Sequence, residues 1–237
     1  MKKIFLYNYF HNQTNDKTEG GEVDVPLDSS LWPTEWSSTF YKKYPLARKL
    51  FLPTPQDGTF FSILQKRKSA ALHKDISLDV LSYILKCGYG TVDENGTRRT
   101  APSAGARYPL ELYVLFTSKS STAEAGFYHY AIKDHSLEVV CLVSLREEDI
   151  KKMFFEEGEI RSMYIIITAV FQRSISKYGS RGYRYLLLEA GHVGQNIIVA
   201  ATEKGGTTRP LGSVDETRVE KLLGLSSEER VVYCIGL

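Results

Sequence analysis

Cysteine is scarce in this chain of 237 residues, which contains only three. Cys87, Cys141 and Cys234 lie far apart and form no CxxC pair, which excludes a disulfide framework and a zinc site of paired thiolates. The histidines are also scattered, and none forms an HExxH pair. Sparse, unpaired thiols are typical of a reducing compartment, so we expect a cytoplasmic protein without a metal site.

An excess of charge of either sign is also missing. Lysine and arginine together number 30 and aspartate and glutamate 28, which leaves a net charge of +2 at pH 7. Proteins that bind nucleic-acid backbones carry concentrated basic surfaces. The short basic run 66–68 does not supply such a surface. We therefore expect no nucleic-acid partner.

Long apolar runs are absent too. The longest, Met163–Phe171, is far shorter than the roughly 20 residues needed to cross a bilayer. Near the amino end, Asn8 and His11 interrupt the apolar residues and no small-residue cleavage site follows, unlike a signal peptide. We therefore expect no contact with a membrane.

The common nucleotide and hydrolase motifs do not occur. The stretch CGYGTVDENG, residues 87–96, has Asp93 where a GxGxxG fingerprint needs its third glycine, and it follows a predicted helix rather than a strand. The chain has no Walker A sequence and no GxSxG elbow. A Rossmann, P-loop or α/β-hydrolase site is therefore not expected.

Two regions differ in pattern. Residues 1–57 hold five of the eight prolines and show no lasting period, yet they are rich in aromatic residues, which predicts an extended arm that covers a surface. From residue 58 onward, helical and strand periods alternate and include a hairpin, which predicts one α+β domain, 58–237. Helices are predicted at 77–88, 146–155, 181–204 and 215–225, and strands at 110–116, 126–132, 137–143, 163–171 and 230–237.

Three stretches carry residues suited to chemistry. Arg67, Lys68 and Ser69 could grip a phosphate dianion, although a solvated basic turn is the commoner fate of such a triplet. Residues 98–114 contain the small, stiff segment Pro102-Ser103-Ala104-Gly105, which would let the main chain approach a flat ligand; a plain loop is the alternative. A nucleophilic Ser103 is not expected, since no histidine is near it in sequence.

The third stretch is SKYGSRGYRYLLLEAGHVGQN, residues 176–196. It opens with Lys177 and Tyr178, which we expect in a loop, and continues into a helix with polar residues on one face and small or apolar residues on the other. For His192 we expect a structural role. The polar face holds Tyr185, Glu189, His192 and Asn196, and the other face holds Leu186, Ala190, Val193, Gly194, Ile197 and Ala201.

Together these stretches resemble a known family. RKS near residue 67, RRTAPSAGARYPLELYVL, GFYHY and KYGSRGYRYLLLEAGHVGQNIIVAA follow the order and spacing of the SagB-type dehydrogenases. These are flavin enzymes of the nitroreductase superfamily, found in pathways that make thiazole- and oxazole-containing peptides. The resemblance implies a nitroreductase-like fold with a mixed, mainly antiparallel sheet flanked by helices, and an interlocked homodimer with FMN at its interface.

The resemblance also implies roles for individual residues. Arg67 and Ser69 would hold the FMN phosphate, with Lys68 near the ribityl chain or the ring edge. Pro102, Ser103, Ala104 and Gly105 would lie against the isoalloxazine ring from the other subunit, and Leu211 and Gly212 would approach its N5 edge. Lys177 and Tyr178 match the pair that azoline-oxidising relatives place near the substrate.

The chain departs from the family pattern in the residues that would bind the FMN phosphate. The superfamily often has a second arginine two residues after the phosphate-binding serine, where this chain has Ala71, and many relatives continue past the last strand with a basic ligand. The remaining cations must then suffice, or others such as Arg184 must help.

Three functions remain open from the sequence. The first is azoline dehydrogenation, in which Lys177 or Tyr178 is the base; a reference lysine has a pKa of about 10.4, so Lys177 would need a pocket that lowers it. The second is a general NAD(P)H-dependent FMN reductase of nitro or quinone compounds. The third is a flavin-binding scaffold without catalysis. A peptide or small-molecule substrate is expected, together with a cyclodehydratase partner in the first case.

Overall fold

The computed structural model describes most of the chain. It covers residues 6–14, 29–31, 33–42, 45–46, 48–53, 58–69, 76–119, 123–156 and 160–237. Ala71 and much of the expected amino-terminal arm lie outside these residues.

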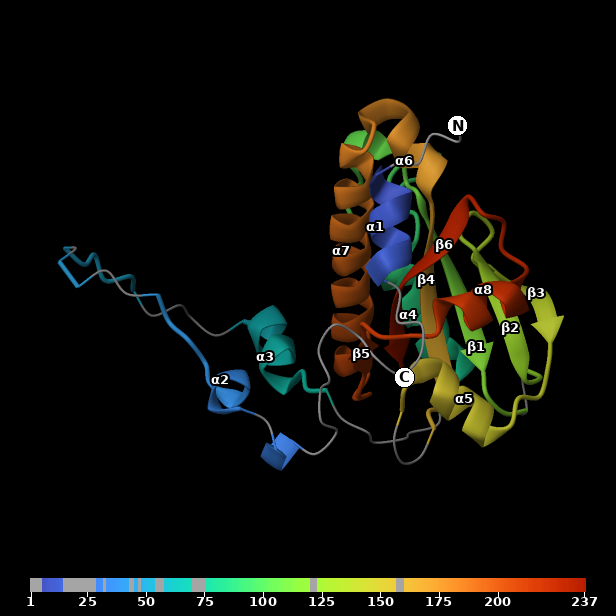
Figure 1. The fold of residues 1–237 in the computed structure, drawn as a ribbon, viewed down its shortest axis with the longest axis horizontal. Helices are drawn as coiled ribbons and strands as arrows, with labels where there is room; N and C mark the ends of the chain where they lie inside the picture. Colours follow the sequence, from blue (N-terminus) through green and yellow to red (C-terminus); the bar gives the residue numbers. More distant parts are fainter. Residues whose placement is uncertain are drawn as a thin grey trace.

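Six strands of the described residues form one sheet in the order β3-β2-β1-β4-β6-β5, and all neighbouring strands are antiparallel (Figure 1). The strand predicted at 110–116 is confirmed, and so is the hairpin of β2 and β3. The strands are β1 (Leu110–Phe116), β2 (Gly126–Ala131), β3 (Ser136–Leu142), β4 (Met163–Val170), β5 (Arg209–Leu211) and β6 (Glu229–Gly236).

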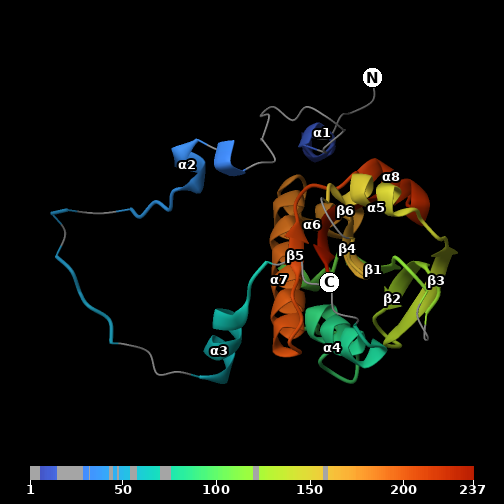
Figure 2. The same ribbon diagram turned by 90° about the horizontal axis from the view of Figure 1, so that it is seen from below.

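Helices cover both faces of the sheet, as Figure 2 shows. On one face lie α4 (Leu78–Tyr89) and the long α7 (Arg181–Glu203), and on the other lie α5 (Glu147–Phe154) and α8 (Glu216–Leu223). The core is therefore divided into two layers by the sheet. This arrangement confirms the predicted α+β class.

The central strands are apolar on both sides because both faces are covered. In β1, Leu112 and Val114 face the layer of α4 and α7, whereas Tyr113 and Leu115 face the layer of α5 and α8. All four are buried, as the alternation of side chains along a strand requires. The largely apolar sequences of β1 and β4, interrupted by Glu111 and Thr168, follow from this double burial.

Helix α4 begins as the sequence predicts but ends later. The Ser77 side chain accepts a hydrogen bond from the Val80 amide, which caps the helix. The expected stop at Gly88 is wrong, because the helix continues to Tyr89. Gly88 instead faces α7, where a Cβ atom would lie 2.6 Å from Ile197 Cγ1. The glycine allows the two helices to pack closely.

A helix that the sequence did not predict follows β4 directly. Helix α6 (Phe171–Tyr178) carries Lys177 and Tyr178 on its last turn, so the expectation that this pair lies in a loop is wrong. Gly179, with φ +56° and ψ −148°, then turns the chain into α7. Only glycine adopts that backbone conformation readily. The reversal brings the end of α6 beside the start of α7.

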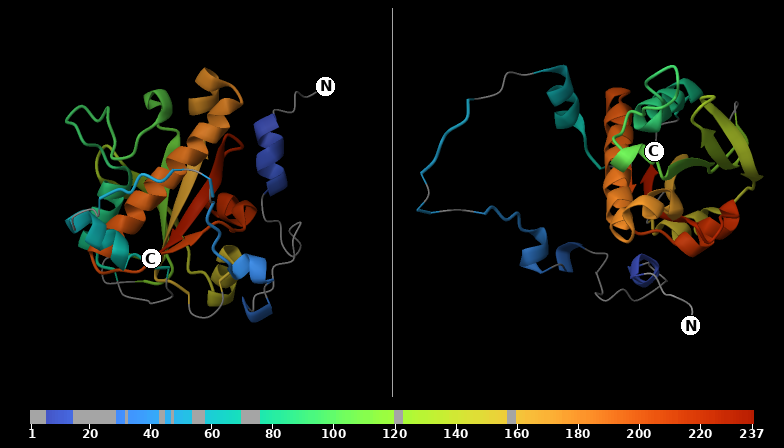
Figure 3. Two further views of the ribbon diagram at one scale, coloured as in Figure 1. Left: turned by 90° about the vertical axis from the view of Figure 1, so that its left-hand side faces the viewer. Right: turned by 90° about the horizontal axis from the view of Figure 1, so that it is seen from above.

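The amino-terminal region contains helices, although an extended arm was expected. Helix α1 (Leu6–Thr14) packs on the domain, where Tyr7 and His11 are buried against Phe171. The next two elements, η1 and α2, lie away from the body of the chain (Figures 1 and 3), whereas α3 lies beside α7. The division into an arm, 1–57, and a domain, 58–237, stays a prediction. The bounds of these elements are η1 (Ser29–Leu31), α2 (Thr34–Ser37) and α3 (Thr59–Lys66).

Candidate functional site

Gly105 and the pair Lys177–Tyr178 meet in space although they are far apart in sequence. Gly105 belongs to a short turn of helix, η2 (Ala104–Ala106), and has a φ of +60°. A Cβ atom at this position would overlap with Tyr178 Oη and Lys177 Nζ. The small segment and the Lys-Tyr pair named from the sequence therefore lie together in the fold. Glycine is required there by both the backbone and the contact.

The backbone of the loop that carries Gly105 is strained at residues that follow this glycine. Ala106 and Tyr108 have φ values of +52° and +46°, a region that residues with side chains rarely adopt. Ser103 closes this loop: its Oγ accepts the Tyr108 amide at 2.8 Å, and its carbonyl accepts the Ala106 amide at 3.1 Å. Such strain persists only where the surroundings impose it, and it clusters at functional sites.

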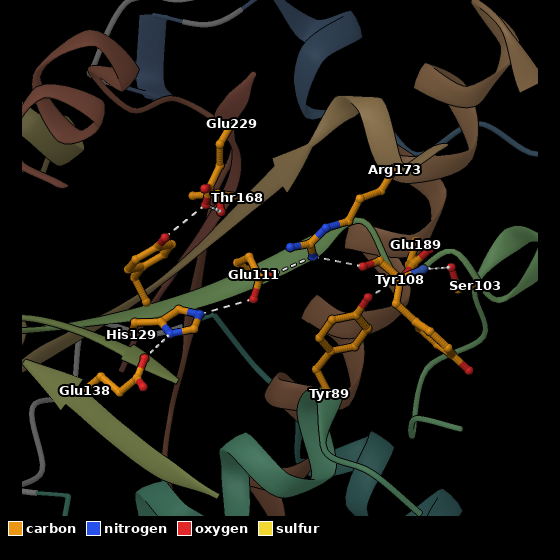
Figure 4. Close-up of polar contacts among 11 residues, drawn as sticks. Tyr89, Ser103, Tyr108, Glu111, His129, Glu138, Thr168, Arg173, Glu189 and Glu229 are labelled. Atoms are coloured by element: carbon orange, nitrogen blue, oxygen red, sulfur yellow. Dashed lines mark hydrogen bonds and ion pairs between the residues drawn. The ribbon is translucent and has the colours of Figure 1, made fainter. Parts of the chain in front are cut away.

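A buried carboxyl group lies behind this loop. Glu189 of α7 is only 3% exposed. Its Oε1 accepts the Tyr89 hydroxyl at 2.5 Å (Figure 4), and the Ser103 hydroxyl lies nearby. Burial raises the pKa of Glu189 above its usual range, although the Ser103 and Tyr89 hydroxyl groups oppose the shift. Neither its burial nor these partners were predicted from the sequence.

Arg99 packs beside the same group. Its guanidinium carbon lies 4.3 Å from the centre of the Tyr89 ring and 4.7 Å from that of Tyr108. Its Nη1 atom is buried and has no hydrogen-bond partner within the described part of the chain. Arg99 thus contributes positive charge near Glu189, which favours the ionised carboxylate.

An ion pair and hydrogen bonds connect helix α6 to residues 107–111, the segment after the loop. Arg173 forms an ion pair with Glu111 and donates from Nη1 to the Tyr108 carbonyl at 3.3 Å. In return, Arg107 Nε donates to the Arg173 carbonyl at 2.7 Å. Lys177 lies one helical turn beyond Arg173. These bonds therefore fix Lys177 relative to Gly105.

Glu111 extends this network across the sheet. His129 on β2 lies between Glu111 Oε2 at 3.1 Å and Glu138 Oε2 at 2.9 Å (Figure 4). The hydrogen bond with Glu111 and then that with Glu138 raise the pKa of His129, although burial opposes them. Burial tends to raise the pKa of Glu111, but the bonds to His129 and Arg173 outweigh it and the pKa is lowered.

The remaining predicted residues gather elsewhere. Ser69 forms a parallel bridge with Thr208, and Arg67 and Lys68 beside it are exposed. Thr208 precedes β5, so exposed Arg209 adds a third cationic side chain at this end of the sheet. The sequence-based interpretation missed Arg209.

Leu211 and Gly212 follow in the same strand region. Leu211 is buried and pairs with Cys234, while no atom lies within 4 Å of a Cβ built at Gly212. The structure therefore brings Arg67, Lys68, Ser69, Leu211 and Gly212 to one end of the chain's long helix.

The two groups of predicted residues lie at opposite ends of α7 (Figure 1). The Tyr178 ring contacts Tyr185 at the start of this helix, whereas Gly206 bonds to Ala201 near its end. A helix of 23 residues is about 34 Å long. Arg184 belongs to the first end, away from Ser69 of the same chain.

In the residues described, no group of three or more His, Cys, Asp or Glu side chains is arranged to hold a metal ion. Within the same part of the chain, no helix is both long enough and apolar enough to cross a membrane.

Residues 70–237 match the model of the nitroreductase family. The chain belongs to this family. A protein of Methanocaldococcus jannaschii assigned to the nitroreductases is 32% identical over 191 residues, which are 78% of this chain and 94% of that protein. The nitroreductase-like fold predicted from the motifs is therefore confirmed.

Two further relatives are processing proteins. The trifolitoxin-processing protein TfxB of Rhizobium leguminosarum is 26% identical over 94% of this chain and 64% of its own length. The microcin B17-processing protein McbC of Escherichia coli is 26% identical over 63% of this chain. The matched region is 57% of McbC, so this nitroreductase chain spans only about two thirds or less of either processing protein.

Solved structures share the fold. A chain of the Escherichia coli microcin synthetase McbBCD complex with truncated pro-MccB17 bound has a TM-score of 0.72 at 19% identity, covering 96% of this nitroreductase chain and 89% of that chain. A Ralstonia eutropha protein assigned to the nitroreductases has a TM-score of 0.65 at 20% identity, covering 78% and 86%.

Proposed function

We propose that this chain is an FMN-dependent oxidoreductase that dehydrogenates azoline rings, thiazoline or oxazoline, to azoles in a modified peptide. The contact of Gly105 with Lys177 and Tyr178 carries the proposal, because it joins a ring-binding segment to two groups able to take a proton. The similarity to TfxB and McbC, both processing proteins, supports a peptide substrate.

The residues present fit FMN. Pro102, Ser103 and Ala104 offer small side chains to a flat ring, and Gly105 beside them has none. Arg67, Lys68 and Ser69, joined by Arg209, offer cations and a hydroxyl to a phosphate. The Leu211–Gly212 backbone would approach the reactive edge of the ring.

The chemistry divides between cofactor and protein. Dehydrogenation of an azoline removes a hydride and a proton from adjacent ring carbons, and FMN when bound supplies the hydride acceptor. The protein must take the proton at Lys177 Nζ or at Tyr178 Oη. The Lys177 ammonium nitrogen lies 5.4 Å from the centre of the Tyr178 ring, so the two groups face the same space.

We further propose a homodimer in which each FMN is held by both subunits. The ring segment and the phosphate segment occupy opposite ends of α7 in one chain, so two antiparallel copies would bring them together. Exposed apolar side chains support a large covered surface. They include Leu31, Trp36, Phe40, Tyr41, Leu46, Leu50, Phe51, Leu52, Phe60 and Phe61.

The proposal is tested with purified protein, FMN and an azoline-containing peptide. Lys177→Ala should lower turnover by roughly 10²–10⁴, the usual loss when a general base is removed, with FMN content unchanged. Tyr178→Phe removes only the hydroxyl and separates packing from proton transfer. If both variants keep wild-type turnover at matched flavin content, the pair is structural. A monomer by sedimentation that still binds FMN tightly would contradict the dimer.

A second candidate is a general NAD(P)H-dependent FMN reductase of nitro or quinone compounds. It is favoured by the similarity to the Methanocaldococcus protein, of which the alignment covers 94%. Anaerobic mixing with NADPH separates the two functions, since rapid bleaching of the flavin is expected only for the reductase. The first proposal also implies a cyclodehydratase that supplies the azoline, and a cytoplasmic location.

A further inference from the structure

We propose that Glu111 is a positioning residue for the candidate site, which holds Lys177 in place by binding Arg173 of α6. The inference rests on the proposed function for its catalytic meaning, since Lys177 is one of the two candidate proton acceptors. Its structural part concerns the protein alone and can be tested without a substrate. The alternative is that the charged pair of Glu111 and Arg173 stabilises the fold as a whole.

Helix α6 depends on contacts outside itself. It has eight residues, and no side chain caps its amino end. A helix of this length is not stable in isolation, because forming the first turn fixes several residues for one hydrogen bond. The position of its last turn, which carries Lys177 and Tyr178, is therefore set by the segments that α6 packs against.

Arg173 connects α6 to the segment that leads from the Gly105 loop into β1. Its Nη1 atom donates to Glu111 Oε1 and to the Tyr108 carbonyl, the latter at 3.3 Å. Lys177 follows four residues later, so the side chains of Arg173 and Lys177 lie on the same face of α6. Glu111 is thus connected to Lys177 through a single turn of helix.

The Glu111 carboxylate is itself held from β2. Its second oxygen, Oε2, lies 3.1 Å from His129 Nε2. A carboxylate only accepts, so the imidazole N–H donates to it. With one oxygen bound to α6 and the other to β2, the carboxylate cannot rotate without losing a hydrogen bond (Figure 4). The Glu111 side chain is only 16% exposed, which limits the access of water to both bonds.

A neutral amide in place of Glu111 would keep the shape of the side chain but not its charge. Arg173 would then donate to a neutral oxygen, and such hydrogen bonds are roughly half as strong as charge-assisted ones. The Arg173 side chain is 40% exposed, so water competes for its guanidinium once this bond is weakened. Glu111→Gln therefore loosens the connection to α6 while the packing around position 111 is kept.

Hydrogen exchange of the Gly179 amide, followed by NMR on the full chain, tests the structural step. This amide donates to the Ile175 carbonyl at 2.8 Å, so its exchange reports on the last turn of α6. Glu111→Gln should speed the exchange roughly three- to tenfold, as expected when a partly exposed charged hydrogen bond is weakened. The Gly90 amide, which ends α4 in the same way, should keep its rate.

Glu138→Gln is the matched control. Glu138 Oε2 lies 2.9 Å from His129 Nδ1, on the side of the imidazole away from Glu111. Its substitution removes an equal charge from the same network and should leave the Gly179 rate unchanged. Equal acceleration in Glu138→Gln would contradict the proposal, because the effect would then not depend on the bond to Arg173.

Arg173→Gln should speed Gly179 exchange at least as much as Glu111→Gln, and the double variant should add little to Arg173→Gln alone. Full additivity would overturn the proposal, since Glu111 would then not act through Arg173. So would an unchanged Gly179 rate in Glu111→Gln. Equal acceleration at Gly90 would mean that the pair stabilises the whole fold. If Glu111→Gln does not fold, Glu111→Asp, which keeps the charge but shortens the side chain, is measured in the same way.

The catalytic step has a separate readout. With FMN and an azoline peptide, Glu111→Gln should lower kcat about tenfold with little change in KM or flavin content, because a displaced last turn of α6 misaligns the proton acceptor rather than the substrate. Glu138→Gln should keep the wild-type kcat. If the wild-type chain oxidises no azoline, the proposed function fails, and Gly179 exchange still decides the structural proposal. Faster Gly179 exchange with unchanged kcat would overturn the positioning role of Glu111.

Discussion

Gly105 lies against Lys177 with no space for a side chain between them. The contact joins a loop before β1 to the last turn of α6. The Tyr108 amide bonds to Ser103 and the Tyr108 carbonyl to Arg173 of α6, so the two segments that meet at this contact are connected to each other.

Gly105→Ala should abolish FMN binding or azoline turnover while the fold is kept. The added methyl group overlaps with Lys177 Nζ and Tyr178 Oη and also meets the left-handed backbone penalty of about 1–2 kcal/mol. Gly224→Ala is the matched control, because Gly224 has a similar backbone, with φ +66°, but open space around its Cβ position. Flavin content and circular dichroism are measured for Gly105→Ala and Gly224→Ala. Equal losses would mean that backbone strain, not the contact, matters.

Arg67→Gln should weaken FMN binding by about 10- to 100-fold, the usual range for a hydrogen bond to a charged group. Riboflavin lacks the phosphate, so its dissociation constant should hardly change. Lys66→Gln on the preceding helical turn serves as the charge-matched control. Titration of the wild-type chain and both variants with FMN or riboflavin, followed by flavin fluorescence, gives the dissociation constants. A similar loss for both ligands would show that Arg67 does not contact the phosphate.

Gly88→Ala should lower the free energy of unfolding by about 1–3 kcal/mol, the typical effect of overpacking. The new Cβ atom would lie 2.6 Å from Ile197 Cγ1, inside the contact of α4 with α7. The double variant Gly88→Ala/Ile197→Ala restores space and should recover part of the loss relative to Ile197→Ala alone. Urea unfolding of the wild-type chain, the two single variants and the double variant gives the coupling free energy between the two positions. Additive effects would contradict a direct contact.

Stability should depend on pH through His129. Its folded pKa is raised, mainly by Glu111, so its contribution is complete below the unfolded value of about 6.5 and is lost as pH rises through the folded value. Wild-type protein should therefore lose stability over this range relative to His129→Gln. Thermal unfolding at several pH values gives the stability of both proteins. The contributions of other titratable groups cancel in the difference, because both proteins contain them. Parallel curves would show that the ion pairs contribute nothing.

Elements with a strong period were predictable from the sequence. Met163–Val170 is apolar apart from Thr168 because both faces of the sheet are covered, and the faces of α7 follow the 3.6-residue period. The short α6 was missed because Lys177 and Tyr178 read as polar loop residues before a glycine. Its helical form depends on docking to Tyr108 and Glu111, which no local pattern reveals.

The site was predictable in its parts but not in its connections. The motif resemblance named Gly105, Lys177 and Tyr178, and chain folding brings them together. In the sequence Glu189 is one of several polar residues on a helix face, although its spacing of three and four residues from Leu186 and Val193 places it beside the apolar face. Its partner Tyr89 and the nearby Ser103 come from distant segments, so only the tertiary structure identifies them.

The two halves of the proposed FMN site lie at opposite ends of α7. Two different variant chains should therefore complement each other in a mixed dimer. In a mixed dimer of one Lys177→Ala chain and one Arg67→Gln chain, one site would combine both defects and the other would contain neither. Co-expression of two inactive chains should thus restore up to half of the activity per mixed dimer. Subunit complementation of this kind requires that each cofactor be shared between chains. Two self-contained monomers would show none.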